Sequence, residues 1–282
     1  MYRNTFLSVM FLACCFNGSL CAQSDAQIYE RTCDAKTYPF SDPSPVATPN
    51  NSYYPYFRFD GFSMQAQEKQ WKMVVLENDY VKLTVTPEIG GKIWGAIDKV
   101  NNKEFVYTNG VVKFRDVAMR GPWTSGGIEF NFGIIGHAPT CSTPIDYLTK
   151  KNVDGSVSCH IFSYEWITRT VWNVEINLPK DKAYFTTHTT WFNQSSIDQP
   201  YYQWMNAGYA TKTGTRFYYP GTYSIGHSGD LHPYPIDEEG RDVSWYDNNN
   251  FGASKSLHII GDYNDYFGIY WHNEKHGSAH YS

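Results

Sequence analysis

The sequence predicts an all-β chain folded as an antiparallel sandwich. Runs of alternating apolar and polar residues recur at short spacing from residue 73 to residue 271, with turn-forming segments between them. Aromatic residues make up 17% of the chain, and this composition favours strands over helices. The sequence shows no convincing amphipathic helix of ten or more residues. Many short strands joined by turns are typical of a sandwich.

The first 22 residues are expected to be a secretory signal. Arg3 provides a short positive region, residues 6–16 are mostly apolar, and Ala22 suits cleavage. The apolar run is too short for a bilayer, which needs ~20 residues, so no transmembrane segment is expected. A lipid-anchored form is the alternative, because three cysteines lie in this segment.

The rest of the chain divides into an arm and one large domain. Residues 23–55 are polar and proline-rich, which predicts an extended N-terminal arm. Residues 56–282 are long enough for a single β-sandwich domain. The expected strands cover residues 73–76, 81–85, 92–97, 104–107, 157–164, 168–178, 183–193, 201–209, 215–219, 257–260 and 266–271.

Charge, cysteines and missing motifs exclude several classes of function. The net charge is −5 and no Lys/Arg cluster occurs, so nucleic acid is not an expected partner. The chain lacks a nucleophile elbow, a P-loop and a dinucleotide fingerprint, and no cofactor is expected. Outside the signal only Cys33, Cys141 and Cys159 remain, an odd number that leaves at least one free thiol. Cys141 and Cys159 could pair across a hairpin. The absence of a CxxC pair argues against structural zinc.

The most informative stretch is residues 120–137, where polar and aromatic side chains lie among five glycines. Arg120, Trp123, Glu129 and His137 are the residue types that a sugar site requires. The carboxylate and the cation hydrogen-bond hydroxyls, the imidazole moves protons, and the indole covers a ring face. The alternative for Glu129 is a buried ion pair with Arg120 or Arg115. We therefore expect Glu129 and His137 to be catalytic and Arg120 and Trp123 to bind substrate.

Further candidates lie outside this stretch. Asp146 is a possible second carboxylate for acid–base work, and Asn206 is expected to face the site. Trp204 could stack on a ring or, as an indole more often does, belong to the core. His272, Glu274 and His276 alternate and would share one face of a strand. That pattern could hold a metal but equally suits an exposed polar face, and no metal is expected. His227 and His232 flank a Gly-Asp loop and would form a polar rim.

Residues 72–107 resemble the opening of the galactose mutarotase (aldose 1-epimerase) superfamily. The shared features are a strand, a Pro-Glu-Ile-Gly-Gly loop at 87–91, a strand starting at Lys92, a turn with Asp98, and a strand with Glu104-Phe105. Residues 122–131, 136–140, 144–147, 191–193, 204–207 and 217–220 are similar to an uncharacterised exported bacterial branch, often placed ahead of tetratricopeptide repeats. The resemblance implies a large antiparallel supersandwich, incomplete at its C-terminal end, with a carbohydrate site in its concave face.

One departure from the superfamily shapes the expected function. The strand that carries the general-acid His in mutarotases reads Tyr-Gln-Trp-Met-Asn at 202–206 here. The resemblance therefore implies a domain that binds or acts on an oligosaccharide or glycoside, exported to the periplasm or cell surface of a diderm bacterium. The alternatives are a non-catalytic recognition or scaffold module of a larger repeat protein and a true aldose epimerase.

Overall fold

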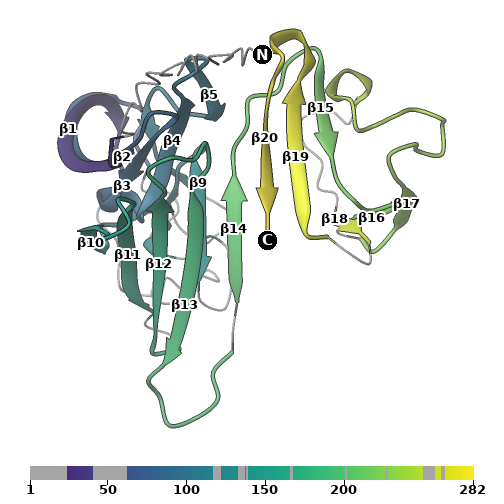
Figure 1. The fold of residues 1–282 in the computed structure, drawn as a ribbon. Helices are drawn as coiled ribbons and strands as arrows, with labels where there is room; N and C mark the ends of the chain where they lie inside the picture. Colours follow the sequence, from purple (N-terminus) through teal and green to yellow (C-terminus); the bar gives the residue numbers. More distant parts are fainter. Residues whose placement is uncertain are drawn as a thin grey trace, which may run out of the picture.

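A computed structural model describes residues 24–40, 62–116, 122–132, 137, 139–165, 168–200, 202–226, 228–249, 258–261 and 264–282. In these ranges the regular elements are strands and short 3-10 turns joined by loops, so the predicted all-β, sandwich-like fold is confirmed (Figure 1). The 3-10 turns are η1 (Pro87–Ile89), η2 (Pro139–Ser142), η3 (Tyr246–Asn248) and η4 (His272–Glu274). Within the described residues, no helix has the length and apolar character needed to cross a bilayer.

The largest sheet has eight strands in the order β14-β9-β4-β3-β2-β1-β6, with β5 paired to β4. Its strands are β1 (Gln27–Tyr38), β2 (Gln67–Glu77), β3 (Val81–Thr86), β4 (Lys92–Asp98), β5 (Lys103–Val106), β6 (Val112–Lys113), β9 (Ile128–Phe132) and β14 (Gln203–Ala207). All pairs are antiparallel except the short contact between β1 and β6. Two short strands, β7 (Arg115–Asp116) and β8 (Pro122–Trp123), pair beside it.

A four-stranded sheet covers one face of the large sheet. Its order is β10 (Asp146–Lys151), β11 (Val157–Glu165), β12 (Thr170–Leu178) and β13 (Thr186–Asn193). Alternation along β12 buries Trp172, Val174 and Ile176 between the sheets, as the period of two requires. Trp172 stacks on Phe132 of the large sheet, with ring centroids 4.5 Å apart. This sandwiched layer is the main hydrophobic core.

The opposite face of the large sheet carries a smaller apolar cluster. Trp71 and Met73 of β2 pack there with Trp94 of β4 and Phe114. Side chains one residue away, such as Val74 and Ile93, point into the main core instead. Both faces of the sheet are therefore partly covered, and the second face is the one that carries the candidate site.

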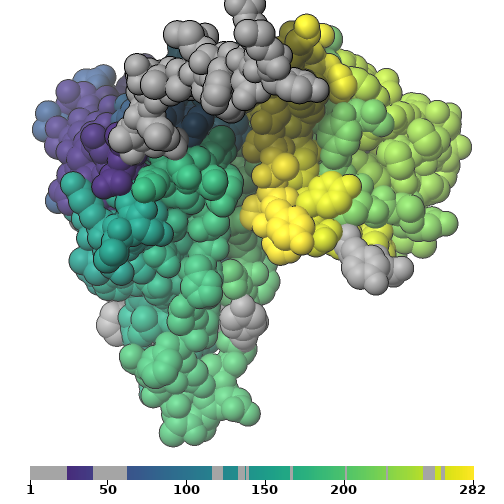
Figure 2. All heavy atoms as spheres, in the orientation of Figure 1, coloured from purple at the N-terminus to yellow at the C-terminus, as the bar shows by residue number. Residues whose placement is uncertain are grey.

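The C-terminal third forms two small sheets beside the sandwich (Figures 1 and 2). One has the order β15-β19-β20, and the other has the order β17-β16-β18. Their strands are β15 (Thr215–Tyr218), β16 (Tyr223–Ile225), β17 (Leu231–Pro233), β18 (His258–Ile260), β19 (Tyr266–Trp271) and β20 (His276–Tyr281). Lys103 of β5 donates to the Glu274 carbonyl at 2.7 Å, which ties this region to the large sheet.

The N-terminal segment differs from the extended arm expected over residues 23–55. Gln27–Tyr38 is β1, which Figure 1 shows as a strongly curved strand and which pairs with β2 over eleven residues. This part is therefore integral to the sheet. Most residues of β1 are exposed, so the strand lacks the alternation of apolar and polar residues by which a strand is predicted. The expected signal, residues 1–22, lies outside the described residues.

Two expectations about cysteines and histidines need correction. Cys141 and Cys159 do not pair, because Cys141 lies in η2 while Cys159 lies on β11, and neither forms a disulfide. His272, Glu274 and His276 do not share a strand face, because His272–Glu274 is the 3-10 turn η4 and only His276 belongs to β20. Among the described residues no cluster of His, Cys, Asp or Glu could hold a metal.

Candidate functional site

The candidate site lies on two neighbouring strands at one edge of the large sheet. Glu129 of β9 is opposite Asn206 of β14 in the strand register. Ile128, Phe130 and Phe132 point into the main core. Because side chains alternate along a strand, Glu129 and Asn131 point to the opposite face. Packing in the main core therefore fixes the position of β9, and the Glu129 carboxylate projects from the opposite face of that strand.

Three donors converge on one oxygen of the buried Glu129 carboxylate. Its Oε1 accepts from Asn131 Nδ2 at 2.9 Å and from Asn206 Nδ2 at 3.2 Å. The third contact is His137 Nδ1, at 2.8 Å. An ionised carboxylate only accepts hydrogen bonds, so a neutral His137 paired with it carries its proton on Nδ1 and leaves Nε2 as an acceptor. Glu129 therefore orients the imidazole and sets its tautomer.

Two indole rings flank His137. Its ring centroid lies 4.8 Å from that of Trp204 and 5.7 Å from that of Trp123, both in edge-on geometry. Trp204 is 37% exposed, whereas the His137 side chain is 15% exposed and Glu129 only 2%. The three side chains therefore lie at different depths: the Glu129 carboxylate is the most buried, the His137 imidazole lies above it, and the Trp204 indole is at the surface.

Two buried polar atoms of this site have no partner among the described residues. They are Glu129 Oε2, an acceptor, and Trp123 Nε1, a donor. A buried polar atom without a hydrogen bond costs about 1–3 kcal/mol. Such atoms in native proteins are associated with catalytic or binding roles or with bound water. Within the described part of the chain, Glu129 Oε2 therefore lacks a donor, and Trp123 Nε1 lacks an acceptor.

The turn that leads into β9 requires glycine. Gly126 and Gly127 have φ values of +74° and +66°, in the region that side chains rarely adopt. A Cβ at Gly127 would lie 2.3 Å from the Ile93 carbonyl oxygen. This close approach lets Gly127 donate to the Tyr107 carbonyl at 2.8 Å and accept from Gly208 N at 2.8 Å. The turn therefore anchors β9 and the segment after β14 to each other.

Lys92 is a buried cation beside the site that the sequence analysis did not single out as functional. It is 1% exposed, and its Nζ donates to the carbonyl and hydroxyl of Thr124. The Nζ also lies 5.8 Å from the ring centroid of Trp123. Burial lowers the pKa of Lys92, and the Glu129 charge opposes that shift. The sequence signal for such a role was the position of Lys92 at the start of an apolar strand.

Asn131 was also missed. It lies two residues after Glu129, so the alternation of a strand already places both on one face. Nearby, burial and then the Glu129 charge raise the pKa of the Cys141 thiol well above its ordinary range. This thiol is therefore protonated and unreactive in the folded protein.

Five of the seven predicted site residues lie together: Glu129, His137, Trp123, Trp204 and Asn206. Asp146 is exposed at the start of β10 in the other sheet. Arg120 and His227 lie outside the described residues. His232 is bonded to Glu238 at 2.9 Å on the surface.

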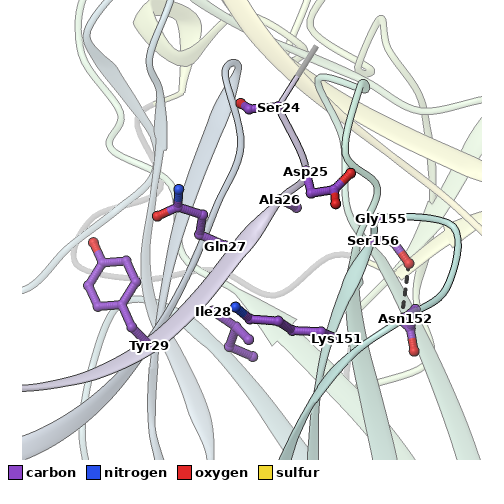
Figure 3. A pocket seen from close by; sticks show the side chains of 10 residues that line it. All are labelled: Ser24, Asp25, Ala26, Gln27, Ile28, Tyr29, Lys151, Asn152, Gly155 and Ser156. Carbon is purple, nitrogen blue, oxygen red and sulfur yellow. Dashed lines mark hydrogen bonds between the residues drawn. The ribbon is translucent and has the colours of Figure 1, made fainter. Parts of the chain in front are cut away.

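A separate hollow of about 530 Å³ lies where β1 begins (Figure 3). It is lined by residues 24–29 and by the segment between β10 and β11. Asn152 donates to Ser156 Oγ at 3.0 Å, and Ala26 N donates to the Gly155 carbonyl at 3.0 Å. These bonds tie the start of β1 to the second sheet, so we interpret the hollow as structural.

The chain belongs to the family described as Domain of unknown function (DUF5107), whose model matches residues 48–282. Its fold is also similar to a solved TPR-domain containing protein from Parabacteroides distasonis, with a TM-score of 0.69 and 23% sequence identity. The match covers 88% of this chain and 40% of that chain, so this chain spans less than half of the neighbour's length. At this identity the likeness concerns the fold alone.

Proposed function

We propose that this chain is an exported carbohydrate-binding domain whose site is built on Glu129 and His137. The observation that carries the proposal is the buried Glu129–His137 pair, with an unpartnered acceptor and an unpartnered donor next to exposed indole surface. A sugar presents hydroxyls that donate and accept, so its hydroxyls would supply a donor to Glu129 Oε2 and an acceptor to Trp123 Nε1. Trp204 supplies the flat apolar surface on which a pyranose ring would stack.

The same residues would carry acid–base chemistry if the domain turns over its ligand. His137 Nε2 would accept a proton from a ligand hydroxyl, and Glu129 would stabilise the imidazolium that forms. This is the division of labour between base and orienting carboxylate in Ser-His-Asp triads. Asp146 has no part in this proposal, since it is exposed on a different sheet. The sequence resemblance to the galactose mutarotase superfamily supports a sugar as the ligand.

The test is calorimetric titration with a panel of mono- and oligosaccharides. We expect Glu129→Gln and Trp204→Ala each to weaken binding at least tenfold while the circular dichroism spectrum is kept. Glu165→Gln is the matched control, because Glu165 is also a buried carboxylate but bonds to Thr168 in a distant turn. Failure of every sugar to bind the wild type would refute the proposal.

The second candidate is a non-catalytic recognition or scaffold module within a longer repeat protein. The description of the structural neighbour as a TPR-domain containing protein favours it. Turnover of a saccharide that Glu129→Gln abolishes in a folded variant would eliminate this candidate. Polarimetry of free hexoses tests the remaining alternative, a true aldose epimerase, which predicts accelerated mutarotation.

A further inference from the structure

A cleft of about 880 Å³ separates the large sheet from the C-terminal sheet. Met205 and Ala207 of β14 line one side, and residues 277–281 of β20 line the other. Figure 1 shows the two strands side by side and running in opposite directions, each at the edge of its own sheet. Two strand edges thus face each other across this cleft.

The hydrogen-bond pattern shows which backbone groups of β14 face the cleft. In an antiparallel pair, residues alternate between those bonded to the neighbouring strand and those that point away. Gly208 N donates to the Gly127 carbonyl at 2.8 Å, and these two residues continue the register of β14 with β9. Since Gly208 is bonded to the neighbouring strand, so is every second residue before it along β14. The residues in between, Met205 and Ala207, therefore direct their N–H and C=O groups away from β9.

The same reasoning applies to β20. Ser282 N donates to the Asp265 carbonyl at 2.9 Å, in continuation of the register with β19. Gly277, Ala279 and Tyr281 must therefore direct their N–H and C=O groups away from β19. The outward groups of both strands belong to residues that line the cleft.

The cleft is lined mainly by uncharged side chains, together with the imidazoles of His276 and His280. No Lys or Arg is among its described lining residues. Asp98 is its only carboxylate, and this group already accepts from Val100 N at 2.9 Å and from Asn101 Nδ2 at 2.7 Å. Apolar and aromatic side chains such as Phe105 and Ile128 line most of the remainder.

We propose that this cleft binds an extended, uncharged polypeptide strand of a partner protein, which joins the two sheets through main-chain hydrogen bonds. Unpaired strand edges are templates for such pairing. Because β14 and β20 run in opposite directions, the bound strand is antiparallel to one and parallel to the other. Successive residues of the bound strand direct their N–H and C=O groups to opposite sides. Every second residue therefore bonds to β14, and the residues between them bond to β20.

Proline variants of β20 provide the test. Ala279→Pro removes an N–H that faces the cleft and leaves the β19 ladder intact, whereas Ser278→Pro removes a ladder hydrogen bond. We expect Ala279→Pro to retain a melting temperature near the wild-type value and Ser278→Pro to melt earlier. The probe is an acetylated, amidated heptapeptide of alternating Val and Thr, titrated by fluorescence anisotropy against the 282-residue chain.

Ala279→Pro and Ala207→Pro are each expected to weaken binding of this peptide at least tenfold. Gly110→Ala is expected to leave it unchanged, because a Cβ at Gly110 meets nothing within 4 Å and Gly110 does not line the cleft. Should the proline variants not fold, N-methylation of alternate peptide residues removes the same hydrogen bonds and is expected to weaken binding equally. The proposal is overturned if no peptide binds at millimolar concentration, if binding survives both changes, or if sedimentation shows the cleft occupied by a second copy of the chain.

Discussion

At the scale of single residues, the structure tests one of the two ion pairs considered for Glu129, the pair with Arg115, whereas Arg120 lies outside the described residues. The sequence suggested an ion pair with Arg115 or Arg120 as the alternative to a functional role. Arg115 instead lies over the Phe62 ring, with 4.6 Å between its guanidinium carbon and the ring centroid. Glu129 bonds His137 and two asparagines, and the buried cation beside it is Lys92. The carboxylate is therefore part of an oriented polar cluster.

Lys92 leads to a prediction about pH. Burial lowers its pKa in the folded state below the ordinary value of 10.5, whereas the unfolded chain keeps the ordinary value. Between these two values the unfolded chain binds more protons, so this contribution to the free energy of unfolding rises with pH. The Lys92 contribution to the free energy of unfolding is fully present above pH 10.5 and is lost as the pH falls through the folded-state pKa.

We expect the free energy of unfolding of Lys92→Met to rise less between pH 8 and 10.5 than that of the wild type. Urea unfolding of both proteins at half-unit pH intervals measures the two slopes. Because other groups titrate equally in both proteins, the difference between the slopes isolates Lys92. Identical slopes would contradict the buried state of this lysine.

At the scale of elements, two glycines determine how β9 is presented. The sequence marked the Gly-rich run as a turn near a pocket, and the structure shows the reason. Gly126 and Gly127 take positive φ, and the chain passes so close to β4 that no side chain fits at Gly127. The location of Glu129 therefore depends on this turn as much as on strand pairing.

Gly127→Ala is expected to destabilise the fold by about 1–3 kcal/mol, because alanine must adopt the left-handed region and its Cβ would meet the Ile93 carbonyl. The control is Gly110→Ala, where a Cβ meets nothing within 4 Å. That change is expected to be neutral or stabilising by up to about 1 kcal/mol. Chemical denaturation of both variants checks the difference, and equal stability would disprove the argument.

At the scale of the whole molecule, folding buries the three described cysteines, Cys33, Cys141 and Cys159, to different degrees. Cys159 lies in the main core, where burial raises its pKa to about 12. Cys141 is buried in η2, and Cys33 is half-buried on β1. Because the thiolate is the reactive form, global folding should control which cysteine can be alkylated.

We expect iodoacetamide at pH 8 to label Cys33 at least tenfold faster than Cys141 or Cys159. Adding 8 M urea without a reductant should make all three equally reactive, since none is in a disulfide. Peptide mass spectrometry measures the labelling at each site. Rapid labelling of Cys141 in the folded protein, or its protection in urea, would contradict the structure.

The all-β class, most strands from β2 onward and the glycine turn ahead of Glu129 could be predicted from the sequence. These features depend on local alternation and on glycine conformations, which neighbouring residues encode. The assembled fold was needed to show that β1 joins the sheet, that Ile128–Phe132 is a strand, that His272–Glu274 is a turn, and which candidates meet. Glu129 and Asn206 are 77 residues apart and meet through strand register, whereas Asp146 is on another sheet. Such contacts depend on how sheets assemble around a core, and a short sequence motif does not encode that assembly.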